Sequence, residues 1–228
     1  MIIEVIVQHS KEIVEAAYGK ADRVELVSHM QHGGLTPDAQ TLKDALLMSF
    51  VPVHVMVRPH DDSFIYTEAD QEIMLQTIAL IDTYKGKNIV IGALKEDLRI
   101  DTDFLERVIE SYPYMNITFH RAFDRARDVF EAYDTLCHYP QVKWILTSGG
   151  HADCMGGKDN LKRLVQKQKA QAGPIIMPGS GLNLENINAL HQHIQADAYH
   201  FGKAVRLQQS FDYGFDQSTL KQLKTILK

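Results

Sequence analysis

The chain has 228 residues, of which 45% are apolar and 23% charged, so it can bury a sizeable core and is not a disordered polymer. Acidic and basic residues are interleaved and the net charge is −5, which argues against a nucleic-acid-binding stripe or an electrostatic membrane anchor. The first residues lack a basic leader and include Glu4, so we expect a cytoplasmic protein in which Cys137 and Cys154 are reduced.

Short runs rich in Val, Ile and aromatic residues alternate with longer stretches that carry a helical apolar stripe. Eight strands are predicted, at Ile2–Gln8, Arg23–Ser28, Val51–Pro59, Asn88–Leu94, Asn116–Asp124, Val142–Gly149, Pro174–Gly179 and Ala196–Gly202. Eight such units in one uninterrupted series favour an α/β fold, a single (β/α)8 TIM barrel over residues 1–228. An open doubly wound sheet is disfavoured, because the first strand-to-helix turn, 8–12, has no glycine-rich phosphate loop.

Several helix starts carry capping signals. Thr36 followed by Pro37 predicts an N-cap with proline at the first helical position. Thr67 and Asp70 resemble a capping box, and Asn183 is predicted to cap the seventh helix. An apolar stripe over 218–228 predicts an eighth helix.

Polar residues recur with period two in strands that should be buried on both faces. In the third strand the valines share one face, whereas His54, Met56 and Arg58 share the other. The same parity argument gives a predicted polar lumen of Glu4, Glu25, His54, Met56, Arg58, His120 and His200. Several of these lie toward the carboxyl ends of strands, where barrel active sites are built. A purely structural network, such as Glu25 against Arg58, is the alternative.

Two further turns have small residues before a helix and are suited to an anion. Ser148 and Gly149 follow the sixth strand, and Gly179 and Gly181 follow the seventh. Lys203, after the eighth strand, could add positive charge. Together these features favour a phosphate or carboxylate ligand.

Several blocks in this order resemble the CutC family of copper homeostasis proteins: GGLTPD (33–38), VPVHVMVRP (51–59), ITFHRAFD (117–124), ILTSGG (145–150) and PIIMPGSGL (174–182). The resemblance spans essentially the whole chain and implies a cytoplasmic, copper-associated TIM barrel. Many relatives have a cysteine where this chain has Val27, and some have one where it has Ile65.

Two functions follow as hypotheses. The first is copper homeostasis, with copper ion bound through His54, Met56 and His120 or through the loop that carries His29 and His32. The second is an enzyme acting on a small anionic or phosphorylated metabolite, with His120 as general acid/base, Glu25 as its carboxylate partner and Arg58 as anion clamp. Predicted ligand-binding residues are His54, Arg121, Asp124, Ser148, Gly149, Gly179, Gly181 and His200. Arg, His and Glu suit an anion and a proton transfer, whereas Cu(I) prefers sulfur, so residue chemistry favours the enzyme. The expected partner is a small anion or a metal ion, with no nucleic acid and no membrane; the sequence leaves open whether copies assemble into a homo-oligomer.

Overall fold

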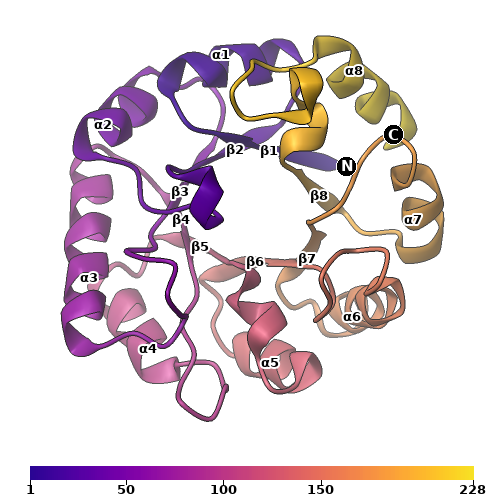
Figure 1. The fold of residues 1–228 in the computed structure, drawn as a ribbon. Coiled ribbons are helices and arrows are strands. Elements are labelled where there is room, and N and C mark those ends of the chain that lie inside the picture. Colours follow the sequence, from indigo (N-terminus) through magenta and orange to yellow (C-terminus); the bar gives the residue numbers. More distant parts are fainter.

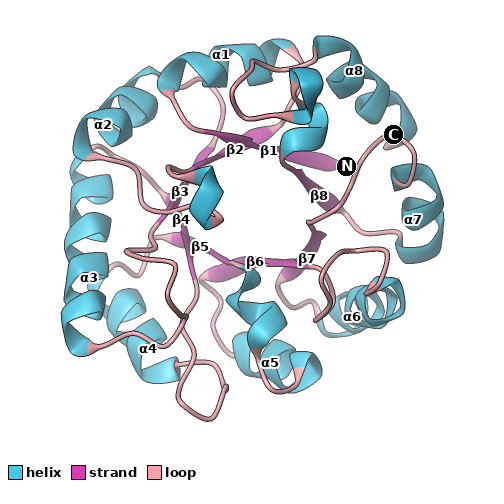
Figure 2. Ribbon diagram, viewed as in Figure 1, coloured by secondary structure: helices cyan, strands magenta, loops and turns pink.

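The computed structural model describes all 228 residues and is a barrel of eight parallel strands surrounded by eight helices (Figures 1 and 2). The strands are β1 (Ile2–Val7), β2 (Arg23–Leu26), β3 (Val53–Met56), β4 (Asn88–Ile91), β5 (Asn116–Phe119), β6 (Val142–Thr147), β7 (Ile175–Pro178) and β8 (Ala198–Phe201). The helices are α1 (Ser10–Tyr18), α2 (Ala39–Met48), α3 (Glu68–Thr83), α4 (Thr102–Ser111), α5 (Val129–Leu136), α6 (Lys158–Gln171), α7 (Ile187–Ile194) and α8 (Gln217–Ile226). The predicted fold class is confirmed.

From β1 to β7 each strand pairs in parallel with the next one along the chain, and β1 also pairs with β8, so the sheet curls round on itself. Between β7 and β8 there is no continuous ladder. A single bridge, Gly179 with His200, joins these two strands at their carboxyl ends. Between β7 and β8 the ring is therefore closed by one bridge only.

The main apolar core of 53 buried residues lies largely between the sheet and the helices, where the valines of β3 point. Two much smaller apolar clusters contain inward-facing strand residues, one with Met56 and Ile6 and the other with Met177 and Leu146. Buried polar residues of β1, β2, β3, β5 and β8 also point inward. No helix has the length and apolar character needed to cross a membrane.

Two of the predicted helix starts are placed differently. The helix after β2 is capped by Asp38, which accepts hydrogen bonds from the Gln40 and Thr41 N–H groups, and not by Thr36. The Thr36 hydroxyl is already bonded to the backbone of Arg58, in both directions. This tertiary contact overrides the local N-cap signal.

The N-cap of α7 is Asn186 and not Asn183. The Asn183 side chain instead accepts the N–H groups of Glu185 and Asn186, so it caps the turn that precedes the helix. The Thr67–Asp70 capping box at the start of α3 is confirmed. The predicted fifth strand is too long, because β5 ends at Phe119 and residues Arg121–Arg125 form a 3₁₀ turn.

Candidate active site

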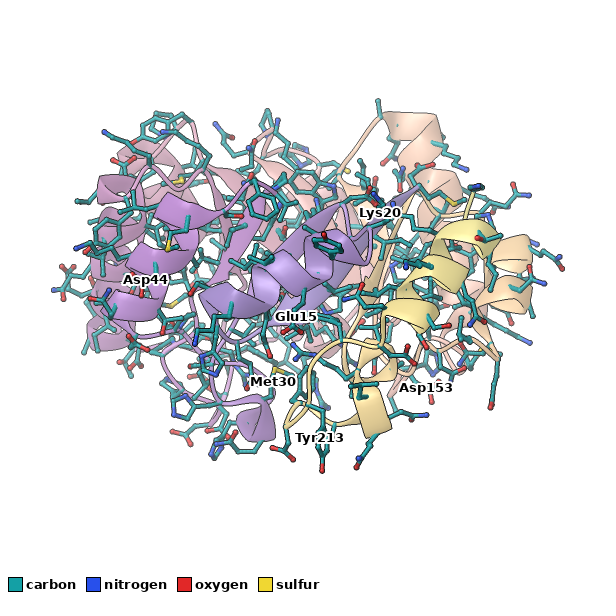
Figure 3. The ribbon with its side chains drawn as sticks, turned by 90° about the horizontal axis from the view of Figure 1, so that it is seen from above. Glu15, Lys20, Met30, Asp44, Asp153 and Tyr213 are labelled. Atoms are coloured by element: carbon teal, nitrogen blue, oxygen red, sulfur yellow. The ribbon has the colours of Figure 1, made fainter.

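A cavity of about 1080 Å³ opens at the carboxyl ends of the strands. Figure 3 shows the barrel from the side: Met30 and Asp153, from the loops after β2 and β6, lie toward one end, and Lys20, from the loop after α1, lies toward the other. Nine of the predicted site residues line this cavity: Glu25, Met56, Arg58, His120, Arg121, Asp124, Gly179, Gly181 and His200. His54, Ser148 and Gly149 do not line it.

In the wall of the cavity, His200 lies between two buried carboxylates. Its Nδ1 is 2.7 Å from Oε1 of Glu4, and its Nε2 is 3.8 Å from Oε2 of Glu25. Glu4 also forms an ion pair with Arg23, whose Nε is 2.7 Å from the second Glu4 oxygen. All four side chains are buried, so each charge depends on its neighbours for compensation.

Aromatic and neutral groups continue this network below the cavity. The Arg23 guanidinium lies over the Trp144 ring, 4.1 Å from its centroid, and donates to the Met177 sulfur at 3.0 Å. The His54 ring meets the edge of Trp144 and its Nδ1 is 3.2 Å from the Thr118 hydroxyl. Burial lowers the pKa of His54 to about 4, so this ring is neutral at pH 7.

The pKa values of Glu4 and Glu25 are shifted in opposite directions. Burial raises the pKa of both, but at Glu4 the Arg23 charge and the His200 contact outweigh it and the pKa falls to about 2. At Glu25 burial and the repulsion of Glu4 dominate, and the pKa rises to about 7. Burial disfavours the charged His200 ring, yet both carboxylates together raise its pKa. Of the two carboxylates, Glu25 is therefore the one that changes charge near neutral pH.

Glu25 was expected to pair with Arg58 or His120, and the structure places it against His200 instead. The second carboxyl oxygen of Glu25, Oε1, is buried and has no hydrogen-bond partner. Because buried polar atoms are normally satisfied, an unpaired atom in a cavity wall marks a position where a ligand can bind.

His120 is held in one ring orientation and one tautomer. Its Nδ1 accepts the N–H of Ala122 at 3.1 Å, so in the neutral ring the proton is on Nε2. That Nε2 is buried in the cavity wall without a partner. Burial, aided by the charge of Arg58, lowers the pKa of His120 to about 3. The ring therefore presents one N–H donor and carries no charge at pH 7.

Neighbouring residues fix the position of this ring. A side chain at Gly92 would place its Cβ 2.5 Å from Nδ1 of His120, so only glycine leaves room for the imidazole. The Phe64 ring lies 5.1 Å from the His120 ring on another side. Phe64 also lies under the Arg58 guanidinium, 4.9 Å away.

Arg58 supports the loop after β2. Its Nη1 donates to the carbonyl oxygens of His32 and Gly34, each at 3.2 Å. Its Nε is buried without a partner, so one donor of the guanidinium is uncommitted. This arrangement suits the predicted anion contact and adds a structural role that the sequence did not indicate.

Arg121 and Asp124 are bound mainly to each other and to the loop after β6. Arg121 donates to Asp124 and to the Ser148 hydroxyl, each at 2.8 Å, and Asp124 accepts the N–H groups of Ser148 and Gly150. Ser148 is fully buried, and Gly149 has a φ of +75° with its α-carbon facing Leu161 and the Gly157 carbonyl. Ser148 and Gly149 were expected at the ligand, whereas here they fix the loop.

One group of side chains could hold a metal ion. Ligand atoms of Glu4, Glu25 and His200 lie within 4.8 Å of one another. Oxygen and imidazole ligands do not match the preference of Cu(I) for sulfur, and the Arg23 charge on Glu4 opposes a cation there. Cys154 is fully buried and burial raises its thiol pKa, so it is not an accessible thiolate.

The sequence reasoning missed several residues. Arg23 has the same strand parity as Glu25, and Trp144 has the same parity as Leu146, so extending the period-two argument would have placed both in the lumen. Phe64 comes from the loop after β3, and only the folded structure brings it onto His120.

The fold and the site together define a TIM-barrel protein with a buried acid–imidazole site at the carboxyl ends of its strands. The model of the CutC family matches residues 1–205. The chain belongs to the CutC family, as predicted from the resemblance.

Relatives agree with this assignment. The chain is 36% identical over 200 residues to a family protein CutC of Parabacteroides distasonis, covering 87% of this chain and 81% of that protein. It is 33% identical over 199 residues to the copper homeostasis protein cutC homolog of Homo sapiens, covering 87% and 72%. The crystal structure of CutC from Streptococcus agalactiae has a TM-score of 0.81 and 25% identity, covering 89% of this chain and 98% of that one.

Proposed function

We propose that this protein is an enzyme that moves a proton on a small anionic carbonyl compound bound in the cavity. The observation that carries the proposal is the buried Glu25, a residue of the cavity wall whose Oε1 has no hydrogen-bond partner and whose pKa is raised to about 7. A general base works best when its pKa is near the working pH. Glu25 meets that requirement.

His120 supplies the complementary group. His120 lines the same cavity and its Nε2–H has no partner in the protein, and a neutral imidazole in that state stabilises negative charge that develops on a carbonyl oxygen. With a pKa of about 3 the ring is a weak base, so the acid/base role passes from His120 to Glu25. Arg58 provides positive charge for the anionic part of the compound.

His200 acts on Glu25 and not on the substrate in this scheme. As an imidazolium held by Glu4, it stabilises the ionised form of Glu25 and so keeps the Glu25 pKa from rising further. When Glu25 takes up a proton, it does so beside the buried ion pair of Glu4 and Arg23.

Deuterium exchange tests this proposal without knowledge of the net reaction. We expect the protein in D₂O to incorporate deuterium beside the carbonyl of at least one member of a panel of three- to six-carbon keto and hydroxyketo acids and phosphates. Below pH 7 the rate should fall about tenfold per pH unit, because Glu25 must be ionised and its pKa is about 7. No exchange across the whole panel, or a rate independent of pH between 5 and 8, would contradict the proposal.

Copper binding is the second candidate, because curated relatives carry the name copper homeostasis protein and the thioethers of Met30 and Met56 line the cavity beside His120. A copper ion on Nε2 of His120 would need the other tautomer, which places an N–H on Nδ1 against the N–H of Ala122. Stoichiometric Cu(I) held against a competing chelator in the wild type, and lost in both Met56→Leu and His120→Ala, would favour copper over the enzyme. We expect no such binding.

A further inference from the structure

One wall of the cavity is formed by the two loops that meet where the barrel closes. Ser180, Gly181 and Leu182 follow β7, and Gly202 and Lys203 follow β8. The Gly179–His200 bridge holds these loops side by side.

The backbone N–H groups of this wall have no acceptor in the protein. Those of Ser180, Gly181, Leu182 and Gly202 donate no hydrogen bond to backbone or side chain, although the neighbouring Gly179 and Asn183 N–H groups do. Four backbone donors without an acceptor in the protein, in two adjacent loops at the cavity wall, are available to a ligand.

The backbone conformation brings successive donors together. Ser180 has a φ of +104° and Gly181 a φ of +73°, and consecutive N–H groups in such a turn can form an anion-binding concavity. Ser180 is held there by its hydroxyl, which donates to the Ala152 carbonyl at 3.0 Å, and by its own carbonyl, which accepts the Cys154 N–H. The loop after β6 therefore stabilises an unfavourable conformation.

The charge of this wall is positive. The Lys203 ammonium is exposed and forms no ion pair within 4.0 Å. The Asp153 carboxylate lies against Gly181, with Oδ2 4.0 Å from the position that a Cβ on Gly181 would take, but Asp153 does not line the cavity and its Oδ1 accepts the Gly156 N–H. Lys203 is the one charged side chain from these two loops that lines the cavity.

Two unpartnered side-chain atoms in the same cavity indicate what the rest of the ligand must do. Nε2 of His120 and Oε1 of Glu25 are buried and have no partner in the protein. A ligand that reaches them from the loops after β7 and β8 must carry an anion at one end and a hydrogen-bonding group at the other.

We propose that the loops after β7 and β8 bind the phosphate of a small phosphate monoester. Four amide donors and one ammonium group suit the three terminal oxygens of a phosphate dianion. This inference rests on the proposed function and names its substrate class: a phosphorylated carbonyl compound, bound by its phosphate at this wall, with the carbonyl toward His120 and Glu25.

Binding measurements with three probes test the phosphate subsite by calorimetry: inorganic phosphate, glycerol 3-phosphate and glycerol. We expect both phosphates to bind and glycerol not to bind, with the ester at least as tight as the free ion. Lys203→Gln should weaken both phosphates about tenfold, because a charge-assisted contact is lost. The matched control Lys221→Gln, on the exposed side of α8, should bind like the wild type.

Amide chemical shifts locate the ion and keep the test independent of folding. Phosphate should move the signals of Ser180, Gly181 and Gly202 in the wild type. Equal affinities for Lys203→Gln and wild type, or shifts confined to other loops, would overturn the subsite. Phosphate bound at this wall without any deuterium exchange would contradict the proposed function alone, and exchange of unphosphorylated compounds only would contradict the subsite alone.

Discussion

Glu4→Gln is expected to lower the free energy of unfolding by about 3 to 5 kcal/mol at pH 7, since it leaves buried cations without their counter-ion. Glu4 is fully buried. One of its carboxylate oxygens is 2.7 Å from Arg23 and the other is 2.7 Å from His200. A glutamine has the same shape but no charge, and one of its two terminal atoms is a donor that faces another donor. Urea denaturation should show a lower midpoint with an unchanged slope.

The effect of Glu4→Gln has a predictable pH dependence. The folded-state pKa of Glu4 is depressed to about 2, so its contribution to stability is present above about pH 4.5 and is lost as the pH falls toward 2. The difference between wild type and variant should therefore shrink at pH 3. Glu110→Gln, at an exposed position of α4, is the control and should change the free energy of unfolding by less than about 0.5 kcal/mol. A loss below about 1 kcal/mol for Glu4→Gln would show that the network does not support the barrel.

Glu25→Gln is expected to have the opposite profile: a rate of deuterium exchange at least about 100-fold lower, and no loss of stability. The amide cannot accept the substrate proton, so the base is removed while the shape of the cavity wall is kept. Exchange is measured by NMR at pH 8, where wild-type Glu25 is ionised.

Glu4 and Glu25 are expected to affect the free energy of unfolding in opposite directions. The folded-state pKa of Glu25 is raised to about 7, so its ionised form costs folding free energy above that pH, and the cost disappears as the pH falls toward 4.5. Glu25→Gln should consequently be at least as stable as the wild type at pH 8. A variant that exchanges at the wild-type rate, or that unfolds as readily as Glu4→Gln, would assign Glu25 a structural role.

Strand periodicity was sufficient to predict the fold and most of the polar lumen. Residues such as Glu25, His54 and His200 were placed correctly because alternation is a local property of each strand. The partners were not predictable. Glu25 meets His200 because β1 pairs with both β2 and β8, and that closure joins residues 175 positions apart in the sequence.

Other differences arose where tertiary contacts replaced local signals. The Thr36 hydroxyl is used by the backbone of Arg58, so the helix starts after Asp38. Ser148 follows the last residue of β6 and turns away from the cavity to bind Arg121. The protonation of Glu25 depends on burial and on the charges of Glu4 and His200, which come from β1 and β8 and cannot be read from its neighbours in sequence; only the charge of Arg23 comes from its own strand.

The single bridge between β7 and β8 gives the ring a seam. Every other pair of neighbouring strands is held by several ladder positions, whereas here only Gly179 and His200 meet. A molecule bound by both the loop after β7 and the loop after β8 would connect these two strands, adding contacts across the seam that the protein itself does not make. Binding of such a molecule would then stabilise the closed ring. Because His200 is one of the two bridged residues, the same binding would also stabilise its contacts with the two carboxylates.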